Sequence, residues 1–294
     1  MRRLFYIGAV ACLAGSLALV LAWRYGETIL PFAVTSAIAD PQDGKVAGGV
    51  YGNAYFDLSY PLPQGFGEGL AGPDPSDSGY YVLGNFIPQA APTATILMAA
   101  QDMFFAGPHR DVAAVTKDFR ESMSQVEAMS IDREPSEVRI GNRAAWRVDF
   151  SGVGLYRAMI VTEIRCHLVS VTLTTRSSDE RDALVQSLDR LTAAKRATPV
   201  CIRDYAAGEQ VVRKVQPAPE VSSSPTPIPV RIIIGTDGTV KHVHVIRATE
   251  LQRRGIGDAL RQWTFKPHVI AGRTVEAETG LAFGRGTSRV SGGL

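Results

Sequence analysis

Two histidines one residue apart form the most metal-like pattern in this sequence. His242 and His244 lie in a stretch of alternating apolar residues that predicts a β-strand, so their side chains point to the same face. Such a pair can bind a metal ion, but a site needs a third ligand. The pattern therefore favours a solvated hairpin face, and we predict no metal site and no cofactor.

Other patterns that could carry chemistry are weak. The glycine-rich segment Gly65-Phe66-Gly67-Glu68-Gly69 follows no βα step and lacks the Lys-Ser/Thr of a phosphate loop. No Gly-x-Ser-x-Gly, His-Glu-x-x-His or Cys-x-x-Cys motif occurs, and His167 and His268 are interpreted as structural. We predict that the protein is not an enzyme. Dispersed catalytic residues leave no local pattern, so an enzyme with its site in residues 49–200 stays as a second alternative.

The chain has three cysteines, too few for a disulfide scaffold or a Cys-rich zinc module. Cys12 lies in an apolar N-terminal run, whereas Cys166 and Cys201 lie in the bulk of the chain. In an oxidising compartment these two could form a disulfide. Two separate buried thiols explain the pattern equally well, and the sequence leaves both alternatives open.

The N-terminus predicts export. Leu4–Trp23 is free of charged residues and follows a pair of arginines. As a helix it would span about 30 Å, the thickness of a bilayer core. We expect residues 1–24 to be an uncleaved inner-membrane anchor with the bulk in the periplasm. The alternative is a signal peptide, cleaved near Ala37-Ile38-Ala39, that releases the chain into the periplasm. The positive charges before the run favour export in either case.

Composition and charge indicate an ordinary globular protein with two oppositely charged parts. The 294 residues are 45% hydrophobic and 20% charged, with a net charge of +2. Residues 25–202 hold 15 basic and 21 acidic side chains, whereas residues 203–294 hold 13 and 8. The overall balance argues against a nucleic-acid partner. The asymmetry indicates two separate folded units.

Residues 25–48 have no clear periodicity and are expected to be a spacer, and residues 49–200 are expected to form the first unit. Strands are predicted at 55–60, 80–86, 95–100, 137–140, 144–150 and 155–174, the last being long enough for one bent strand or for two that meet at Cys166-His167. Amphipathic helices are predicted at 111–126 and 179–191. Helices set apart from a largely antiparallel sheet define the α+β class.

One segment of this unit resembles a known family. Asn53-Ala54-Tyr55-Phe56-Asp57-Leu58-Ser59-Tyr60-Pro61-Leu62-Pro63-Gln64-Gly65-Phe66 is similar to the opening of Mog1/PsbP-like domains. The resemblance covers about residues 50–195. It implies an α/β/α sandwich that acts in binding or scaffolding, and it implies no catalytic residues.

A second unit follows a change in pattern. Residues 201–229, rich in proline and serine after Val215, are expected to be a linker. Residues 230–284 then read as strand, Asp237-Gly238 turn, strand, helix and final strand. A ββαβ unit of this size is marginally stable by itself. The last residues, 285–294, are expected to be a flexible tail.

This unit is similar to the TonB C-terminal domain over about residues 228–284. The match is carried by Val230-Arg231-Ile232, Asp237-Gly238-Thr239-Val240, Val243-His244-Val245-Ile246, Ala259-Leu260-Arg261-Gln262-Trp263-Thr264-Phe265-Lys266-Pro267 and Gly272-Arg273-Thr274-Val275. The resemblance implies structural roles for Asp237, Gly238, Trp263, Phe265, Pro267 and Gly272. It also implies a non-enzymatic role in transmembrane transport, contacting an outer-membrane receptor or another periplasmic protein by β-strand addition.

The final strand, Thr274–Phe283, is the predicted partner surface, and the alternative is an ordinary terminal strand that binds no partner. Alternation places one set of residues on the core, so Glu276 and Glu278 should face out and Gly280 should leave room for a partner backbone. The predicted partner-binding residues are Val275, Glu276, Ala277, Glu278, Thr279, Gly280 and Leu281.

One departure from the TonB pattern bears on function. The family's energy transducers carry a histidine in the membrane helix, but Leu4–Trp23 has none. A motor complex as partner therefore stays uncertain. The first alternative to receptor contact is a periplasmic scaffold without motor coupling, in which the acidic and basic units dock on each other.

Overall fold

A computed structural model describes residues 39–105, 111–193, 199–222 and 224–284, which belong to a compact unit that begins at Ala39. The predicted anchor and the predicted tail lie outside these residues. Within the described ranges, no helix is long and apolar enough to cross a membrane. We call residues 39–193 the first module and residues 199–284 the C-terminal module.

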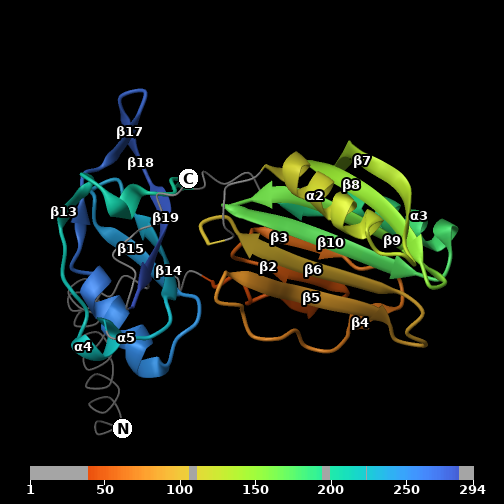
Figure 1. Cartoon of the computed structure of the whole chain (residues 1–294), viewed down its shortest axis with the longest axis horizontal. Helices are drawn as coiled ribbons and strands as arrows, with labels where there is room; N and C mark the ends of the chain where they lie inside the picture. The colour runs from red at the N-terminus through yellow and green to blue at the C-terminus, as the bar shows by residue number, and fades with distance from the viewer. Residues whose placement is uncertain (1–38, 106–110, 194–198, 223, 285–294) are drawn as a thin grey trace, which may run out of the picture. The chain divides into compact units, whose positions relative to one another are not determined.

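A seven-stranded antiparallel sheet forms the centre of the first module, with the order β4-β5-β6-β10-β9-β8-β7 (Figure 1). Its strands are β4 (Phe66–Glu68), β5 (Tyr80–Pro88), β6 (Thr95–Asp102), β7 (Ser130–Ile140), β8 (Arg143–Gly152), β9 (Leu155–Ile164) and β10 (His167–Thr175). The predicted long strand is indeed two strands. It breaks at Arg165 and Cys166, which both have positive φ angles, 48° and 57°, in the turn between β9 and β10.

Helix α2 (Val112–Ser124) covers one face of this sheet (Figure 1). It begins where Asp111 accepts a hydrogen bond from the backbone N–H of Ala114, as an N-cap should. Its apolar side packs on a core that includes Val148, Phe150 and Met159. The amphipathic pattern of the sequence thus predicted both the helix and its buried face.

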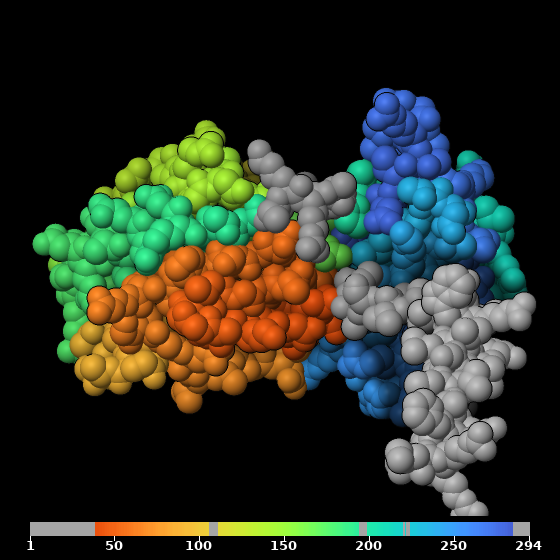
Figure 2. All heavy atoms as spheres, turned by 180° about the vertical axis from the view of Figure 1, so that it is seen from behind, coloured from red at the N-terminus to blue at the C-terminus, as the bar shows by residue number. Residues whose placement is uncertain are grey.

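The opposite face is covered mainly by a second, four-stranded sheet with the order β1-β2-β3-β11, whose first three strands lie in the orange region of Figure 2. Its strands are β1 (Lys45–Ala47), β2 (Val50–Asn53), β3 (Leu58–Pro61) and β11 (Thr192–Ala193). Helix α3 (Ser178–Ser187) and the 3-10 turn η1 (Leu188–Arg190) complete this cover.

The α+β class with mainly antiparallel sheets is therefore confirmed, but the expected helical second layer is largely a sheet. Two details of the expectation change. Part of the expected spacer is the first strand of this sheet, and Tyr55 and Phe56 lie in a turn rather than in a strand. The turn forms because the side chain of Asn53 accepts a hydrogen bond from the backbone N–H of Phe56, which competes with strand pairing.

The C-terminal module contains the predicted ββαβ elements. Its sheet has the order β12-β19-β14-β15, with β12 (Val200–Cys201), β14 (Ile228–Ile234), β15 (Val240–Val245) and β19 (Ala277–Phe283). Helix α5 (Glu250–Leu260) begins with a capping box between Thr249 and Gln252. Ile256 and Leu260 of this helix pack on one face of the sheet.

The final strand differs from the prediction. The stretch 274–283 divides at Glu276, so that β19 begins only at Ala277. Before this point β18 (Arg273–Val275) forms a hairpin with β17 (His268–Ile270), and β16 (Thr264–Phe265) pairs with β13 (Val211–Arg213). The hairpin turn uses positive φ angles at Ala271 and Gly272, which explains the glycine there.

The expectation of a free linker at residues 201–229 is corrected, because the described part of this segment packs into the C-terminal module. It contains η2 (Tyr205–Ala207) and α4 (Pro219–Ser222), and it buries Tyr205 and Val221 in the module's core. The indole N–H of Trp263 donates to the carbonyl of Val215 over 2.7 Å. The proline and serine content of this segment predicted an unpacked linker. The apolar residues among them are nevertheless enough to anchor the segment in the core of the C-terminal module.

Candidate functional site

The sheet of the C-terminal module has two faces with different chemistry. Val230, Ile232 and Leu281 face the apolar core beneath α5. Arg231 and Glu278 alternate with them and face the other way, yet they are only 1% and 2% exposed. The alternation of the final strand was therefore predicted, but Glu278 does not face solvent. Its carboxylate lies against side chains of the first module.

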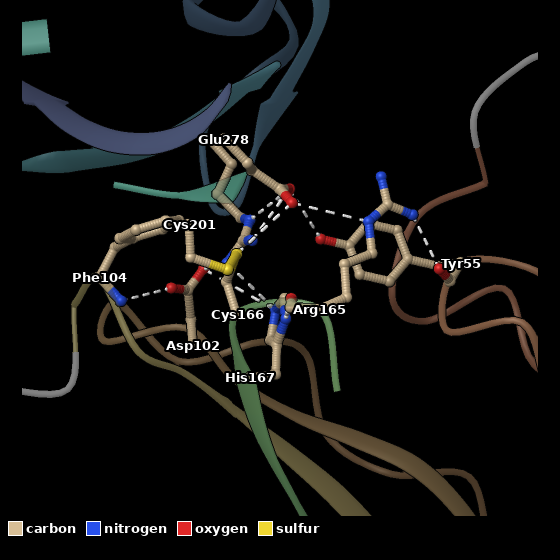
Figure 3. Close-up of a disulfide and its surroundings, with 9 residues drawn as sticks. Tyr55, Asp102, Phe104, Arg165, Cys166, His167, Cys201 and Glu278 are labelled. Atoms are coloured by element: carbon tan, nitrogen blue, oxygen red, sulfur yellow. Dashed lines mark hydrogen bonds and ion pairs between the residues drawn. A yellow bond between two sulfur atoms is a disulfide. The ribbon is translucent and has the colours of Figure 1, made fainter. Parts of the chain in front are cut away.

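Arg231 is the centre of a buried ion cluster, and the two carboxylates that it contacts, Asp102 and Glu278, are labelled in Figure 3. Its Nη1 lies 2.5 Å from Oδ2 of Asp102, and its Nη2 lies 2.9 Å from Oε1 of Glu278. Asp102 is the last residue of β6, where its other carboxylate oxygen accepts the backbone N–H of Phe104 over 2.8 Å. One guanidinium thus bridges a carboxylate of the first module and a carboxylate of its own module.

Arg165 and Tyr55 complete the cluster from the first module (Figure 3). Arg165 donates from Nη1 to the backbone carbonyl of Tyr55 over 2.7 Å, and its guanidinium lies 4.0 Å from the centre of the Tyr55 ring. Its Nε lies 3.6 Å from Glu278. The Tyr55 hydroxyl donates to the same carboxylate over 3.3 Å. Two guanidinium groups therefore neutralise the carboxylates of Asp102 and Glu278, which burial requires.

The electrostatics of the cluster keep Arg231 charged. Burial alone would lower the pKa of its guanidinium, but the carboxylates of Asp102 and Glu278 hold that pKa well above its usual value. Burial likewise raises the pKa of the Tyr55 hydroxyl, so this group stays a neutral hydrogen-bond donor.

His167 joins the cluster as a neutral ring. Burial, together with the charge of Arg231, holds the pKa of His167 well below its usual value. Its Nδ1 lies 2.7 Å from the carbonyl of Arg165, and its Nε2 lies 3.4 Å from Nη1 of Arg231. Both contacts fit a tautomer that donates from Nδ1 and accepts at Nε2. The sequence interpretation of this histidine as structural agrees with this position.

A disulfide joins Cys166 to Cys201 beside the cluster (Figure 3). Cys166 is buried in the turn between β9 and β10, and its sulfur lies 3.7 Å from Oε2 of Glu278. Cys201 lies in β12 and is exposed. Of the two alternatives left open by the sequence, the structure has the disulfide, and this bond connects the two modules covalently.

The outer edge of β19 is partly covered by this same chain. β12 pairs with Ala277 and Glu278 in parallel, and the N–H groups of Val200 and Ile202 donate to the carbonyls of Glu276 and Glu278 over 2.8 and 2.9 Å. Gly280 lies against the first module: a Cβ on it would fall 2.6 Å from Cβ of Phe104. The room at this glycine is therefore filled by a side chain of this protein, and not by a partner backbone.

The other residues of the predicted partner surface are used within the chain. Val275 lies in β18, opposite His268. The carboxylate of Glu276 lies 2.5 Å from the ammonium of Lys241. Thr279 donates its hydroxyl to the carbonyl of Arg203 over 3.0 Å, and Leu281 is buried in the core. Partner binding along this strand stays a prediction.

The expected solvated face at His242 and His244 is also corrected. His244 is only 4% exposed; its Nδ1 lies 2.7 Å from Asp40 and its Nε2 lies 3.4 Å from the Tyr81 hydroxyl. Burial lowers the pKa of the neighbouring His242. In the part of the chain that the structure describes, no group of three or more His, Cys, Asp or Glu residues could hold a metal ion.

The residues assigned structural roles lie where turns and packing need them. Gly238 has a φ angle of 81°, and a Cβ on it would fall 2.1 Å from the carbonyl oxygen of Phe265. Asp237 accepts the backbone N–H of Thr239 in the same turn, and this hydrogen bond lowers its pKa. Trp263 and Phe265 are buried in the core. Pro267 directly precedes β17, and Gly272 forms the β17–β18 turn.

The sequence patterns do not indicate Asp102, Arg165, Arg231 or Tyr55 as a group. A signal was nevertheless present, since Arg231 interrupts an apolar strand and Asp102 ends another. Charged residues are almost never fully buried unless they are paired, so each predicts a partner elsewhere. Only the fold identifies those partners. Because the cluster is sealed from solvent, its chemistry is suited to holding two modules together.

Comparisons with known proteins give a limited result. Neither the scan against protein-family models nor the search of curated proteins finds a match. Among solved structures, the chain is similar to cyanobacterial PsbP (CyanoP) from Synechocystis sp. PCC 6803, with 13% identity and a TM-score of 0.37 over 51% of this chain and 98% of that one. A PsbP protein, the relative that the sequence of the first module suggested, is thus among the similar structures.

Two further solved structures are similar over less of the chain. LpqN of Mycobacterium tuberculosis, described as involved in cell envelope biogenesis, has 16% identity and a TM-score of 0.30 over 46% of this chain and 82% of its own. A Pseudomonas aeruginosa protein of unknown function has 18% identity and a TM-score of 0.31 over 41% of this chain and 87% of its own. At these scores we draw no functional conclusion from the likeness.

Proposed function

We propose that this protein is a non-enzymatic adaptor of the cell envelope, in which a PsbP-like module and a TonB-like C-terminal module are locked together to hold a partner protein. The observation that carries this proposal is the position of Arg231 between Asp102 and Glu278. A cluster that neutralises itself out of reach of solvent supports a scaffold better than a catalytic centre. The opposite net charges of the two parts of the chain agree with docking.

The docking proposal makes a thermodynamic prediction for the full chain. Because the disulfide and the ion cluster connect the modules, calorimetry should record one cooperative unfolding transition for the oxidised protein. Arg231→Met should lower the temperature of this transition, since it leaves two buried carboxylates without their shared counterion. Two well-separated transitions in the unmodified, oxidised protein would contradict the proposal.

The second part of the proposal is contact with an outer-membrane receptor or another periplasmic protein by β-strand addition to β19, as the TonB resemblance implies. The specific observation in its favour is that β12 covers β19 only at Ala277 and Glu278. An extended segment could take the place of this two-residue strand, with backbone hydrogen bonds giving the affinity. We do not include a motor complex, because Leu4–Trp23 lacks a histidine.

Strand addition can be tested with synthetic peptides that copy the N-terminal periplasmic segments of outer-membrane receptors from the same genome. Each peptide would be titrated into the immobilised full chain, with a scrambled peptide of equal composition as the control. Sequence-dependent binding that protects β19 amides from hydrogen exchange supports the proposal. Equal binding of native and scrambled peptides, or none, in both the oxidised and the reduced chain contradicts it.

The proposed location also has a direct test. We propose that residues 1–24 anchor the protein in the inner membrane with the modules in the periplasm, or, alternatively, that they are removed after export. Sequencing the N-terminus of the mature protein distinguishes an intact Met1 from cleavage near Ala39. A chain recovered from the cytosol with free Cys166 and Cys201 thiols would contradict both.

A further inference from the structure

The strand β12 is too short to hold its position by pairing alone. It consists of Val200 and Cys201, and two backbone hydrogen bonds join this segment to the carbonyls of Glu276 and Glu278. Isolated strand pairs of this length are not stable in water, because two hydrogen bonds do not offset the entropy of ordering the chain. Something else must keep β12 against β19.

The disulfide provides that restraint from the first module. Cys166 is 1% exposed and lies at the end of the seven-stranded sheet, so it is a rigid anchor, whereas Cys201 is part of β12 itself. The bond therefore attaches the two-residue strand to a separate, larger sheet. This arrangement differs from the ion cluster, which attaches the inner strands β14 and β19 through Arg231 and Glu278.

The two restraints can therefore act independently. With the disulfide broken, Arg231 would still bridge Asp102 and Glu278, and the C-terminal sheet would keep its place. Arg203 would still be held, since it donates to the carbonyl of Met103 over 2.7 Å and accepts from Thr279. Ile202, whose side chain packs on the core of the C-terminal module, would also stay, so Val200 and Cys201 are the residues that lose their restraint. A local release of β12 is the expected consequence, with Ile202 as the hinge.

We propose that the Cys166–Cys201 disulfide is a redox latch, which keeps β12 over Glu276–Glu278 when oxidised and uncovers this edge of β19 when reduced. The inference rests on the strand-addition proposal and names its regulation. Release of β12 leaves the carbonyls of Glu276 and Glu278 without their donors. An extended partner segment, with N–H groups at two-residue spacing, can replace those donors.

The reduction needs a dithiol reductant, and the exposure of Cys201 provides the route of attack. A thiolate of the reductant attacks the sulfur of Cys201 and forms a mixed disulfide, while the Cys166 sulfur leaves as a thiolate and takes up a proton. The second thiol of the reductant then attacks the mixed disulfide and releases Cys201 as a thiol. The protein disulfide gains two electrons and two protons, and the dithiol becomes a disulfide.

Hydrogen exchange on the full chain tests the latch without any partner. Dithiothreitol, a dithiol, would be used as the reductant, and mass spectrometry would follow the amides of Val200 and Ile202. We expect their exchange to accelerate about tenfold or more on reduction, while the amide of Ile232 in β14 stays protected. Cys201→Ser should exchange like the reduced protein with or without dithiothreitol. Cys12→Ser is the matched control and should respond like the unmodified chain.

The outcomes separate the latch from the function on which it rests. Unchanged protection of Val200 and Ile202 in fully reduced protein overturns the latch, and so does a parallel loss of protection at Ile232, which would mean general opening. If β12 opens but the receptor peptides bind neither the oxidised nor the reduced chain, strand addition is wrong and the latch stands. Tighter peptide binding by the reduced chain and by Cys201→Ser supports both.

Discussion

Asp102 and Arg231, which are 129 positions apart in the chain, approach within 2.5 Å, and neither side chain is exposed to solvent. The contact joins the end of β6 in the first module to the middle of β14 in the C-terminal module. Arg231 also bridges to Glu278, so its removal would leave two buried carboxylates with Arg165 as the remaining guanidinium of the cluster. The contribution of this contact to the free energy of unfolding can therefore be measured by replacing Arg231.

Arg231→Met should destabilise the protein by about 3–5 kcal/mol, because breaking a buried ion pair leaves an uncompensated charge. Urea unfolding of the oxidised full chain measures the change. Adding Asp102→Asn to this variant should recover part of the loss, since it removes one of the stranded charges. Arg254→Met, which breaks an exposed pair with Glu250 on α5, is the control and should change stability little. Equal losses in the two arginine variants would contradict the importance of the cluster.

His167 should make the protein less stable in mild acid. Its folded pKa lies well below the usual value of 6.5, so below pH 6.5 the unfolded chain binds a proton that the folded chain does not. The free energy of unfolding therefore falls as the pH drops from 6.5 towards the folded pKa, by up to about 1.4 kcal/mol per pH unit for this group. Above pH 6.5 the imidazole of His167 is neutral in both the folded and the unfolded chain, so it causes no loss of stability there.

Urea unfolding at pH values from 7.5 to about 5 checks this dependence. His242, whose pKa is also lowered by burial, contributes in the same direction, so the unmodified protein should lose stability through both rings. His167→Gln removes one of the two contributions and should reduce the slope. The same slope in His167→Gln and in the unmodified protein would mean that the ring titrates normally in the folded state.

Gly280→Ala should loosen the packing between the modules. The new methyl group would lie 2.6 Å from Cβ of Phe104 and 2.9 Å from Cζ of Phe105, both closer than carbon atoms approach. We expect a loss of about 1–3 kcal/mol, seen as a lower melting temperature, since overpacked sites force neighbours to move. Gly208→Ala is the matched control because nothing lies within 4 Å of its added Cβ and its φ is −128°. A melting temperature lowered equally by both changes would contradict this packing.

The sequence was informative wherever one face of an element meets an apolar core. Alternation and helical periodicity predicted α2 and most strands of the large sheet, and Asp237-Gly238 predicted the β14–β15 hairpin. These patterns are local, since each depends on the period of a single element. The alternation of β19 was read correctly for the same reason. The alternation does not reveal that the second face of β19 is also buried, against side chains of the first module.

The sequence does not predict the buried ion cluster, because the cluster depends on contacts between distant parts of the chain. Nothing near Glu278 in the sequence indicates Tyr55 or Arg165, which come from turns of the first module. A glutamate in an alternating strand normally faces water, and only a guanidinium from another element makes its burial tolerable. The two cysteines gave the one signal that these regions meet, but the sequence left their pairing open.

Trp263→Phe should expose the segment that the sequence analysis took for a linker. The indole N–H donates to the carbonyl of Val215, and Lys214 lies 5.2 Å from the indole ring. Losing the donor leaves a carbonyl without its partner and should cost about 1–3 kcal/mol. In the unmodified protein, trypsin should cleave slowly after Lys214, because Val215 and the neighbouring strand β13 are held in place. In Trp263→Phe the same cleavage should be faster.

Mass spectrometry of a native digestion time course measures this cleavage. Trp146→Phe is the control, because Trp146 also lies beside a lysine, Lys117 at 5.8 Å, but in the first module. It should leave cleavage after Lys214 unchanged. Immediate cleavage after Lys214 in the unmodified protein would mean that residues 201–229 form a free linker after all. In that case the cysteine latch, and not the packed segment, would be the main restraint on the chain between the two modules.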